Sequence, residues 1–462
     1  MPELPRVLCS ASARRVPGVA GALVVLVVVL VLLAALPATA AKSKGRSTTT
    51  TASGGAAKGC AKTSTTTKTP VAPSGPSAET VVAQEGGKGT PRVELVRYPR
   101  PTGTGKPWSQ WGQGLVLPDG RFLSAMGNHL GKDGNSSLFS YDPATHTITR
   151  FSDVRSEVGD ALDWGYGKVH GQIVAGPCGD AFFATYWGTT KGMQYTPRYP
   201  GDVLFHVDGT TLELTSLGSL VPAHGIPSLA GSPKGDAVFG EAVDPAASTV
   251  GTANVHGAFF VVDPRTRKVV FRDDVTDHTG FRNVLVRANG RAYVAAQGGR
   301  LLEYVPGESA LRTYPQAIPG GGVLRASTAP ARDGTVYFAT EKPDRFFAFR
   351  TDGTIERIAD ATGYTTSMAV EPDGSTFYSV PGAHGTQAAL GTPLVAVDPA
   401  TGQSRTIVRL ADLVRRELGL ETAGSYDVAL DAANRRIFVG LNVGPTADDP
   451  WGDVVLAVVE LP

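Results

Sequence analysis

A repeat of about 50 residues limits this chain to few possible folds. From residue 92 onward, each repeat has an apolar strand, a Gly-centred turn, a second β-rich strand, a loop and a hairpin. Seven such turns mark the repeats: Asp119-Gly120, Gly179-Asp180, Lys234-Gly235, Asn289-Gly290, Asp333-Gly334, Asp373-Gly374 and Ala433-Asn434. Seven units of four strands predict an all-β fold, a seven-bladed β-propeller.

The two ends of the chain complete this pattern. Only six of the later hairpins follow residue 100, because the seventh unit ends at "VVLAVVELP", while an unpartnered strand "RVELVRYP" occupies 92–99. Pairing this N-terminal strand with the last three strands would close the ring. A ring of six or eight blades and a pair of β-sandwiches are the alternatives. The segment "IVRLADLVRRELG" at 407–419 has helical spacing and is interpreted as a linker helix between blades six and seven.

Composition agrees with a turn-rich β protein and excludes one class of partner. The chain has 56 Gly and 33 Pro among 462 residues, and only 18% of its residues are charged. Its 43 basic and 42 acidic side chains give a net charge of +1. Because no excess positive charge would attract phosphates, we expect no nucleic-acid partner.

The first 41 residues have the pattern of a secretory signal peptide. Three arginines, at positions 6, 14 and 15, precede an apolar run from Ala22 to Leu36 and a small-residue cleavage site at 38–40. The alternative is an uncleaved membrane anchor over 16–41. Either interpretation predicts that the rest of the chain is secreted or extracellular, and that it contacts a membrane only through this segment.

Residues 42–90 are rich in Ser, Thr, Gly, Lys and Pro, and they predict a disordered linker ahead of a propeller at 91–462. Cys60 lies in this linker and Cys178 lies in the propeller. A disulfide between them is compatible with export, but the sequence leaves the pairing open.

The predicted topology assigns each loop to one of two faces. Loops that lead into an inner strand share a face with the loops between second and third strands. All five tryptophans fall in these loops, and those interpreted as substrate-binding residues are Trp111, Trp164, Trp187 and Trp451, together with Arg282 and Arg325. Loop tryptophans stack well on sugar rings, and arginine matches a carboxylate. Packing within or between blades is the alternative.

His170, His224 and His278 are spaced at intervals of 54 residues, one repeat each, ahead of blades two, three and four. We expect equivalent positions near the channel, where the three could hold a divalent metal such as Zn, Mn or Fe. They could equally act as acid-base groups, or be similar only through the ancestry of the repeats.

Blade two carries a resemblance to a known family. "GKVHGQIV", "GDAFFATYWG" and "RYPGDVLFHVD" are similar to a blade of secreted seven-bladed propellers related to polysaccharide lyases that act on ulvan and other polyuronates. The resemblance implies β-elimination by a histidine and a tyrosine, with an arginine neutralising the uronate carboxylate. It assigns these roles to His170, to one of Tyr186, Tyr195 and Tyr199, and to Arg198, with His129 as a second imidazole.

Two functions therefore remain open from the sequence. One is a polysaccharide lyase, and the other is a non-catalytic propeller that binds a cell-wall glycan or a protein partner. The sequence contains no Gly-x-Ser-x-Gly elbow, no His-Glu-x-x-His motif and no strict calcium loop.

Overall fold

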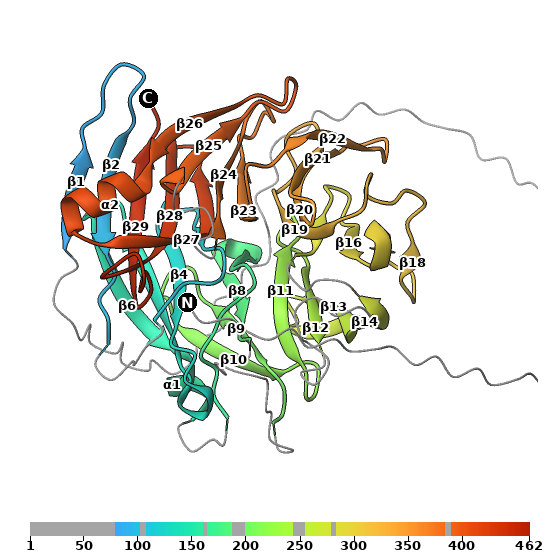
Figure 1. Cartoon of the computed structure of the whole chain (residues 1–462). Helices are drawn as coiled ribbons and strands as arrows, with labels where there is room; N and C mark the ends of the chain where they lie inside the picture. Colours follow the sequence, from blue (N-terminus) through green and yellow to red (C-terminus); the bar gives the residue numbers. More distant parts are fainter. Residues whose placement is uncertain are drawn as a thin grey trace, which may run out of the picture. The chain divides into compact units, whose positions relative to one another are not determined.

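The structure is a computed structural model that describes residues 79–101, 108–159, 164–186, 199–243, 255–278, 283–383 and 390–462. Its described part forms seven antiparallel sheets (Figure 1). This arrangement confirms the predicted all-β, seven-bladed propeller.

Blades one to four are each built from four consecutive strands. Their bounds are β3 Leu115–Val116, β4 Phe122–Gly127, β5 Ser136–Asp142 and β6 Thr147–Asp153; β7 Val174–Ala175, β8 Ala181–Ala184, β9 Val203–Val207 and β10 Leu214–Ser219; β11 Gly225–Gly231, β12 Val238–Val243, β13 Val255–Asp263 and β14 Lys268–His278; β15 Leu285–Val286, β16 Ala292–Ala295, β17 Leu301–Tyr304 and β18 Arg312–Thr313.

Blades five to seven complete the series. Their strands are β19 Val323–Ser327, β20 Val336–Glu341, β21 Arg345–Phe349 and β22 Ile355–Asp360; β23 Thr365–Val370, β24 Phe377–Pro381, β25 Pro393–Val397 and β26 Ser404–Arg409; β27 Glu421–Asp431, β28 Arg436–Gly444 and β29 Asp453–Glu460, joined by β2 Arg92–Arg97 and β1 Thr80–Gln84. The short helices are α1 Val154–Val158, α2 Leu410–Leu418 and the 3-10 turns η1 Gly131–Asp133, η2 Pro177–Gly179 and η3 Gln297–Gly299.

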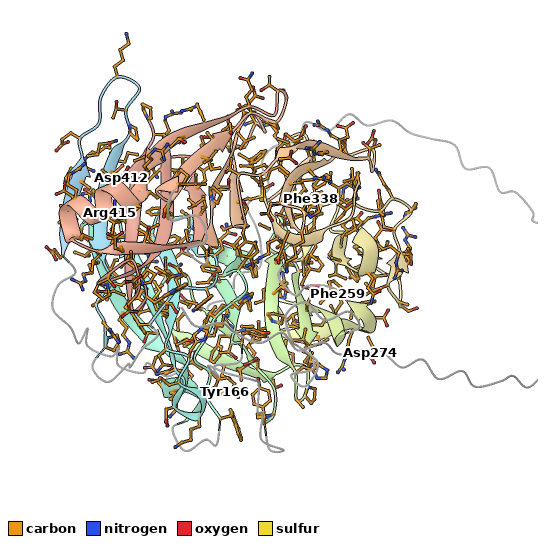
Figure 2. The ribbon with its side chains drawn as sticks, viewed as in Figure 1. Tyr166, Phe259, Asp274, Phe338, Asp412 and Arg415 are labelled. Atoms are coloured by element: carbon orange, nitrogen blue, oxygen red, sulfur yellow. The ribbon has the colours of Figure 1, made fainter. Side chains whose placement is uncertain are left out.

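The hydrophobic core lies between neighbouring blades. Each of seven clusters of buried residues combines side chains from two consecutive sheets, as with Phe122 of blade one and Phe438 of blade seven. Strand residues alternate between two faces, so a blade can bury one face on each neighbour. In Figure 2, Phe259 and Phe338 lie among the strands of blades three and five, whereas Asp412 and Arg415 lie on the outer helix α2.

The last sheet contains strands from both ends of the described chain. β2 pairs with β29, with Arg92 opposite Glu460 and Arg97 opposite Val455. Outside β2, strand β1 (Thr80–Gln84) adds a fifth strand to this sheet. Its sequence "TVVAQ" lies within the range predicted as linker, and its two valines suit a strand. The sheet therefore starts ahead of Pro91, the predicted beginning of the propeller.

Helix α2 connects blades six and seven, as the sequence predicted, but it starts later than residue 407 because β26 continues to Arg409. It buries Leu410, Leu413 and Val414 and ends at Gly419 in a left-handed conformation. Within the described ranges, no helix is long and apolar enough to cross a membrane. The predicted signal segment lies outside these ranges.

Cys178, in the turn between β7 and β8, is disulfide-bonded. Cys60, one possible partner, lies outside the described residues.

Candidate functional site

Close backbone contact between blades one and two brings three loops together. A Cβ atom on Gly127, at the end of β4, would lie 2.1 Å from the carbonyl oxygen of Gly167. Only glycine permits this approach. Gly127 also exchanges backbone hydrogen bonds of 3.1 and 2.9 Å with Ser109, and the His129 amide donates to Gly167 at 3.1 Å. The loops at 108–112, 128–135 and 164–171 therefore meet on one face.

Trp111 is the centre of an aromatic cluster at this meeting point. Its ring lies 5.1 Å from that of His129, 4.8 Å from that of Tyr426 and 5.3 Å from that of Trp451, which is stacked on it at 8°. The indole Nε1 donates to Ser109 Oγ at 2.5 Å. We call Trp111, His129, Tyr426 and Trp451 the Trp111 cluster. Trp111 is half-buried, and its contacts with three other rings place it at the centre of the site.

Lys168 connects the Trp111 cluster to a second group. Its ammonium nitrogen lies 4.2 Å from the centre of the Trp111 ring and 5.6 Å from that of Tyr186. The Tyr186 amide donates to the Lys168 carbonyl at 2.8 Å, so the two residues are fixed side by side. The lysine is only 6% exposed. A cation over aromatic faces in a partly dry site is attracted more strongly than in water.

The second group is the pair His170 and Tyr186, whose rings are 5.2 Å apart. His170 Nδ1 lies 2.7 Å from the carbonyl oxygen of Pro227. A carbonyl only accepts, so Nδ1 carries the proton and Nε2 is the basic nitrogen of the neutral ring. This contact with blade three fixes both the tautomer and the orientation of His170.

His129 is held in an unusual state. Its φ is +52°, a left-handed conformation that few non-glycine residues adopt. The side chain is 7% exposed, and its Nε2 atom has no hydrogen-bond partner among the described residues. Burial, and then the positive charge of Lys168, lower the pKa of His129 well below 6.5. The ring is therefore neutral at physiological pH, and its buried Nε2 offers an unused hydrogen-bonding position.

The structure thus brings together five of the residues that the sequence singled out: His129, His170, Tyr186, Trp111 and Trp451. Sequence reasoning missed Lys168 and Tyr426. A signal for Lys168 was present, since it stands two residues before His170 in "GKVHGQIV", and alternate residues of extended chain share a side.

Other predicted residues have their described contacts outside the Trp111 cluster and the His170–Tyr186 pair. Tyr199 is 4% exposed and packs against Trp164 and Tyr166, with ring centres 6.3 and 6.4 Å apart. The indole of Trp164 donates to the Tyr166 hydroxyl at 3.0 Å, so this tryptophan contributes to packing. Trp108, also on the predicted face, is fully buried in the core between blades seven and one.

Arg325 lies in β19, the inner strand of blade five. It is 3% exposed, donates to the Tyr364 hydroxyl at 2.5 Å and lies over that ring at 4.8 Å. No contact between Arg325 and the Trp111 cluster is present among the described residues. Four further predicted residues lie outside the described ranges: Trp187, Tyr195, Arg198 and Arg282.

The predicted metal trio does not occupy equivalent positions. His224 directly precedes inner strand β11, with Nδ1 2.7 Å from the Pro222 carbonyl oxygen. His278 instead ends β14, the outermost strand of blade three, where it pairs with Val255. The equal spacing was misleading because β14, which is 11 residues long, extends to His278, where the repeat predicted the connection to blade four. The side chain of His278 is outside what the structure describes, and the described side chains contain no group of three potential metal ligands.

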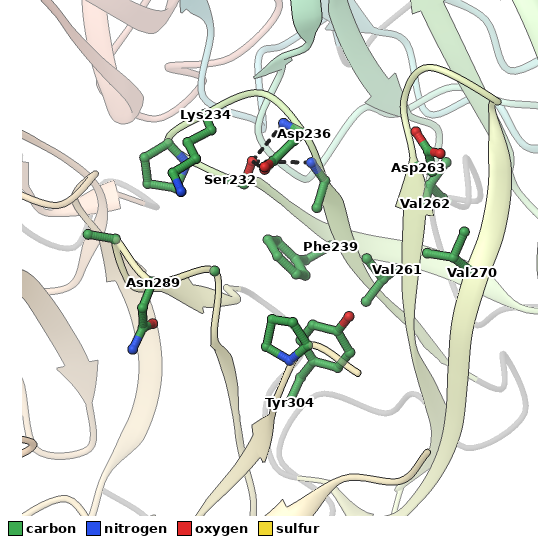
Figure 3. Close-up of a pocket in the computed structure, with 15 residues that line it drawn as sticks. Ser232, Lys234, Asp236, Phe239, Val261, Val262, Asp263, Val270, Asn289 and Tyr304 are labelled. Carbon is green, nitrogen blue, oxygen red and sulfur yellow. Dashed lines mark hydrogen bonds between the residues drawn. The ribbon is translucent and has the colours of Figure 1, made fainter. Parts of the chain in front are cut away.

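A cavity is present in a different part of the propeller. It has a volume of about 340 Å³ and lies between blades three and four, beside Phe239, Val261 and Tyr304 (Figure 3). Its rim is formed by the turns at Lys234 and Asn289, which join first and second strands and so belong to the opposite face. None of the residues predicted for the site lines this cavity.

Comparisons with known proteins agree on the fold. Neither a protein-family profile nor a curated protein sequence matches this chain. Among solved structures, a catalytically inactive variant of virginiamycin B lyase from Staphylococcus aureus with quinupristin superposes with a TM-score of 0.51 at 9% identity, covering 79% of this chain and 99% of that one. Oligogalacturonate lyase in complex with manganese gives a TM-score of 0.51 at 10% identity, covering 84% and 98%. At such identities the likeness concerns the fold alone.

Proposed function

We propose that this propeller is an exported protein that binds uronic-acid glycans at the Trp111 cluster and cleaves them by β-elimination. The observation that carries the proposal is the contact of Tyr186 with both Lys168 and His170. A cation, a base and an acid are the three groups that elimination beside a carboxylate requires.

Each group has a defined role in this reaction. The Lys168 ammonium neutralises the uronate carboxylate, the role that the family resemblance gives to Arg198. His170 Nε2 removes the proton on the carbon next to the carboxylate, and the electron pair of that C–H bond forms a carbon–carbon double bond. The neighbouring bond to the glycosidic oxygen breaks, and that oxygen takes its electron pair and the Tyr186 hydroxyl proton. Proton exchange with water then restores both side chains.

The alternative function is glycan binding without catalysis. Deep burial favours this alternative, because His170 is 6% and Tyr186 5% exposed, which leaves little of either side chain accessible to a polymer. Two proteins of the same fold are named lyases, so the scaffold itself is compatible with elimination chemistry.

A panel of uronic polysaccharides tests the proposal on the full chain. Unsaturated uronate absorbs ultraviolet light, so we expect absorbance to rise with the wild type. We expect His170→Gln and Tyr186→Phe to abolish the rise while leaving glycan binding intact. His224→Gln is the matched control, because this histidine makes the same 2.7 Å contact with a backbone carbonyl but has no described contact with Tyr186.

Two results would count against the proposal. Glycan binding without any rise in absorbance would leave only the binding function. If no member of the panel bound at all, neither binding nor cleavage of uronic-acid glycans would stand.

A further inference from the structure

The segment 109–114, which carries Trp111, is tied to blade seven by buried side chains. Gln110 is fully buried and lies next to Trp111 in sequence. Its backbone amide donates to Asn442 Oδ1 at 2.8 Å, and its carbonyl accepts from Asn442 Nδ2 at 2.8 Å. One side chain of β28 thus satisfies both backbone groups of Gln110, as a neighbouring strand would.

Asp427 of β27 holds the same segment at two further points. Its Oδ1 accepts from the Gly114 amide at 2.9 Å, and its Oδ2 accepts from the Gln110 side-chain amide at 2.5 Å. Gly440 makes room for that amide, because a Cβ there would lie 1.8 Å from Gln110 Oε1. Asp427 and Asn442 are both completely buried, so these contacts do not compete with solvent.

The fixed segment determines what surrounds Trp111. Tyr426, which precedes Asp427 in β27, packs on the Trp111 ring, and Lys168 and His129 contact that ring from blades two and one. A shift of Gln110 would move Trp111, which would move the surface that supports the Lys168 ammonium. Geometric errors of this kind reduce the efficiency of a site without removing any group that touches the ligand.

We propose that Asn442 and Asp427 are positioning residues that hold Gln110 and thereby set the place of Trp111 and of the Lys168 ammonium above it. Neither residue touches a ligand in this scheme. Their effect on ligand binding rests on the proposed function, whereas their effect on Trp111 does not.

The stacked pair Trp111 and Trp451 provides a spectroscopic test. The two indoles are stacked with their centres 5.3 Å apart, so each contributes to the asymmetric environment of the other. The difference between the wild type and Trp451→Phe identifies the band of this pair in the near-ultraviolet circular dichroism spectrum of the full chain. We expect Asn442→Leu to abolish this band and to weaken binding of an oligogalacturonate about tenfold. The matched control is Asn283→Leu, which removes a buried asparagine that donates to Ser327 Oγ at 2.7 Å, away from Trp111. It should leave band and affinity unchanged.

A second variant covers the case in which Asn442→Leu does not fold. Gly440→Ala removes no hydrogen-bonding group, but its methyl group occupies the space of the Gln110 amide. It should weaken the same band. A folded Asn442→Leu or Gly440→Ala protein that keeps the band overturns the positioning role. Failure of the wild type to bind the oligogalacturonate counts against the proposed function, and the band still decides the positioning role.

Discussion

Asp427→Asn should make the stability of the propeller less dependent on pH. Asp427 is completely buried, and the loss of hydration raises its pKa from 3.8 to about 7, despite the hydrogen bonds from Gly114 and Gln110. A carboxyl whose pKa is higher in the folded than in the unfolded state favours folding most when protonated. Its contribution is therefore greatest below pH 3.8 and declines as pH rises toward 7.

The size of this effect follows from the two pKa values. The pKa of Asp427 is about 7 in the folded chain and 3.8 in the unfolded chain. Between pH 5 and pH 8, ionisation of this group therefore lowers the unfolding free energy of the wild type by about 2.5 kcal/mol. Asparagine does not titrate, and its carbonyl can still accept from Gly114. The difference in unfolding free energy between variant and wild type should therefore shift by that amount, in favour of the variant at pH 8.

Urea denaturation at pH 5 and pH 8 measures this shift. Asp398→Asn is the control, because hydrogen bonds from Ala400 and Thr401 lower the pKa of this exposed carboxyl. The Asp398 carboxyl stays charged between pH 5 and 8 in both the folded and the unfolded chain. The difference in unfolding free energy between Asp398→Asn and the wild type should therefore be the same at the two pH values. A shift below about 0.5 kcal/mol for Asp427→Asn would refute the reasoning.

Three further outcomes are expected. Lys168→Met should raise the pKa of His129, measurable by NMR titration, and should weaken uronate binding about tenfold; an unchanged His129 titration would contradict the contact. Gly127→Ala should lower the unfolding free energy by about 2 kcal/mol in urea, because its Cβ meets the Gly167 carbonyl, whereas Gly87→Ala, with open space around it, should not. Cys178→Ser should lower the unfolding free energy by about 2–4 kcal/mol, and a reductant should lower the unfolding free energy of the wild type but not that of the variant.

Much of the fold was predictable because its signals are local and repeated. Each Gly-centred turn marks one blade, and the apolar strands between the turns predict seven sheets. The length of an outer strand was harder to predict, because β14 extends to His278, where the repeat predicted the connection to blade four. Equal spacing in sequence therefore gave unequal positions in space.

The candidate site was predictable only in part. The resemblance of blade two implied His170 and, as one of three candidate tyrosines, Tyr186, and the structure places these two side by side. Lys168 was overlooked because a lysine is usually solvated, and here residues from distant loops, Trp111 and Tyr186 among them, cover it. Trp164 was predicted from its loop position, and no local pattern reveals that its indole donates to the Tyr166 hydroxyl.

The left-handed backbone at His129 has a consequence for directed evolution of the site. In a saturation library at this position, the backbone conformation would decide which variants fold, whether or not a ligand is present. Glycine and asparagine adopt this conformation readily, whereas valine, isoleucine and threonine would prevent the loop from folding. Enrichment of any β-branched residue would mean that the loop had changed its path. Recovery of histidine over glycine under selection for binding would measure what the imidazole itself contributes.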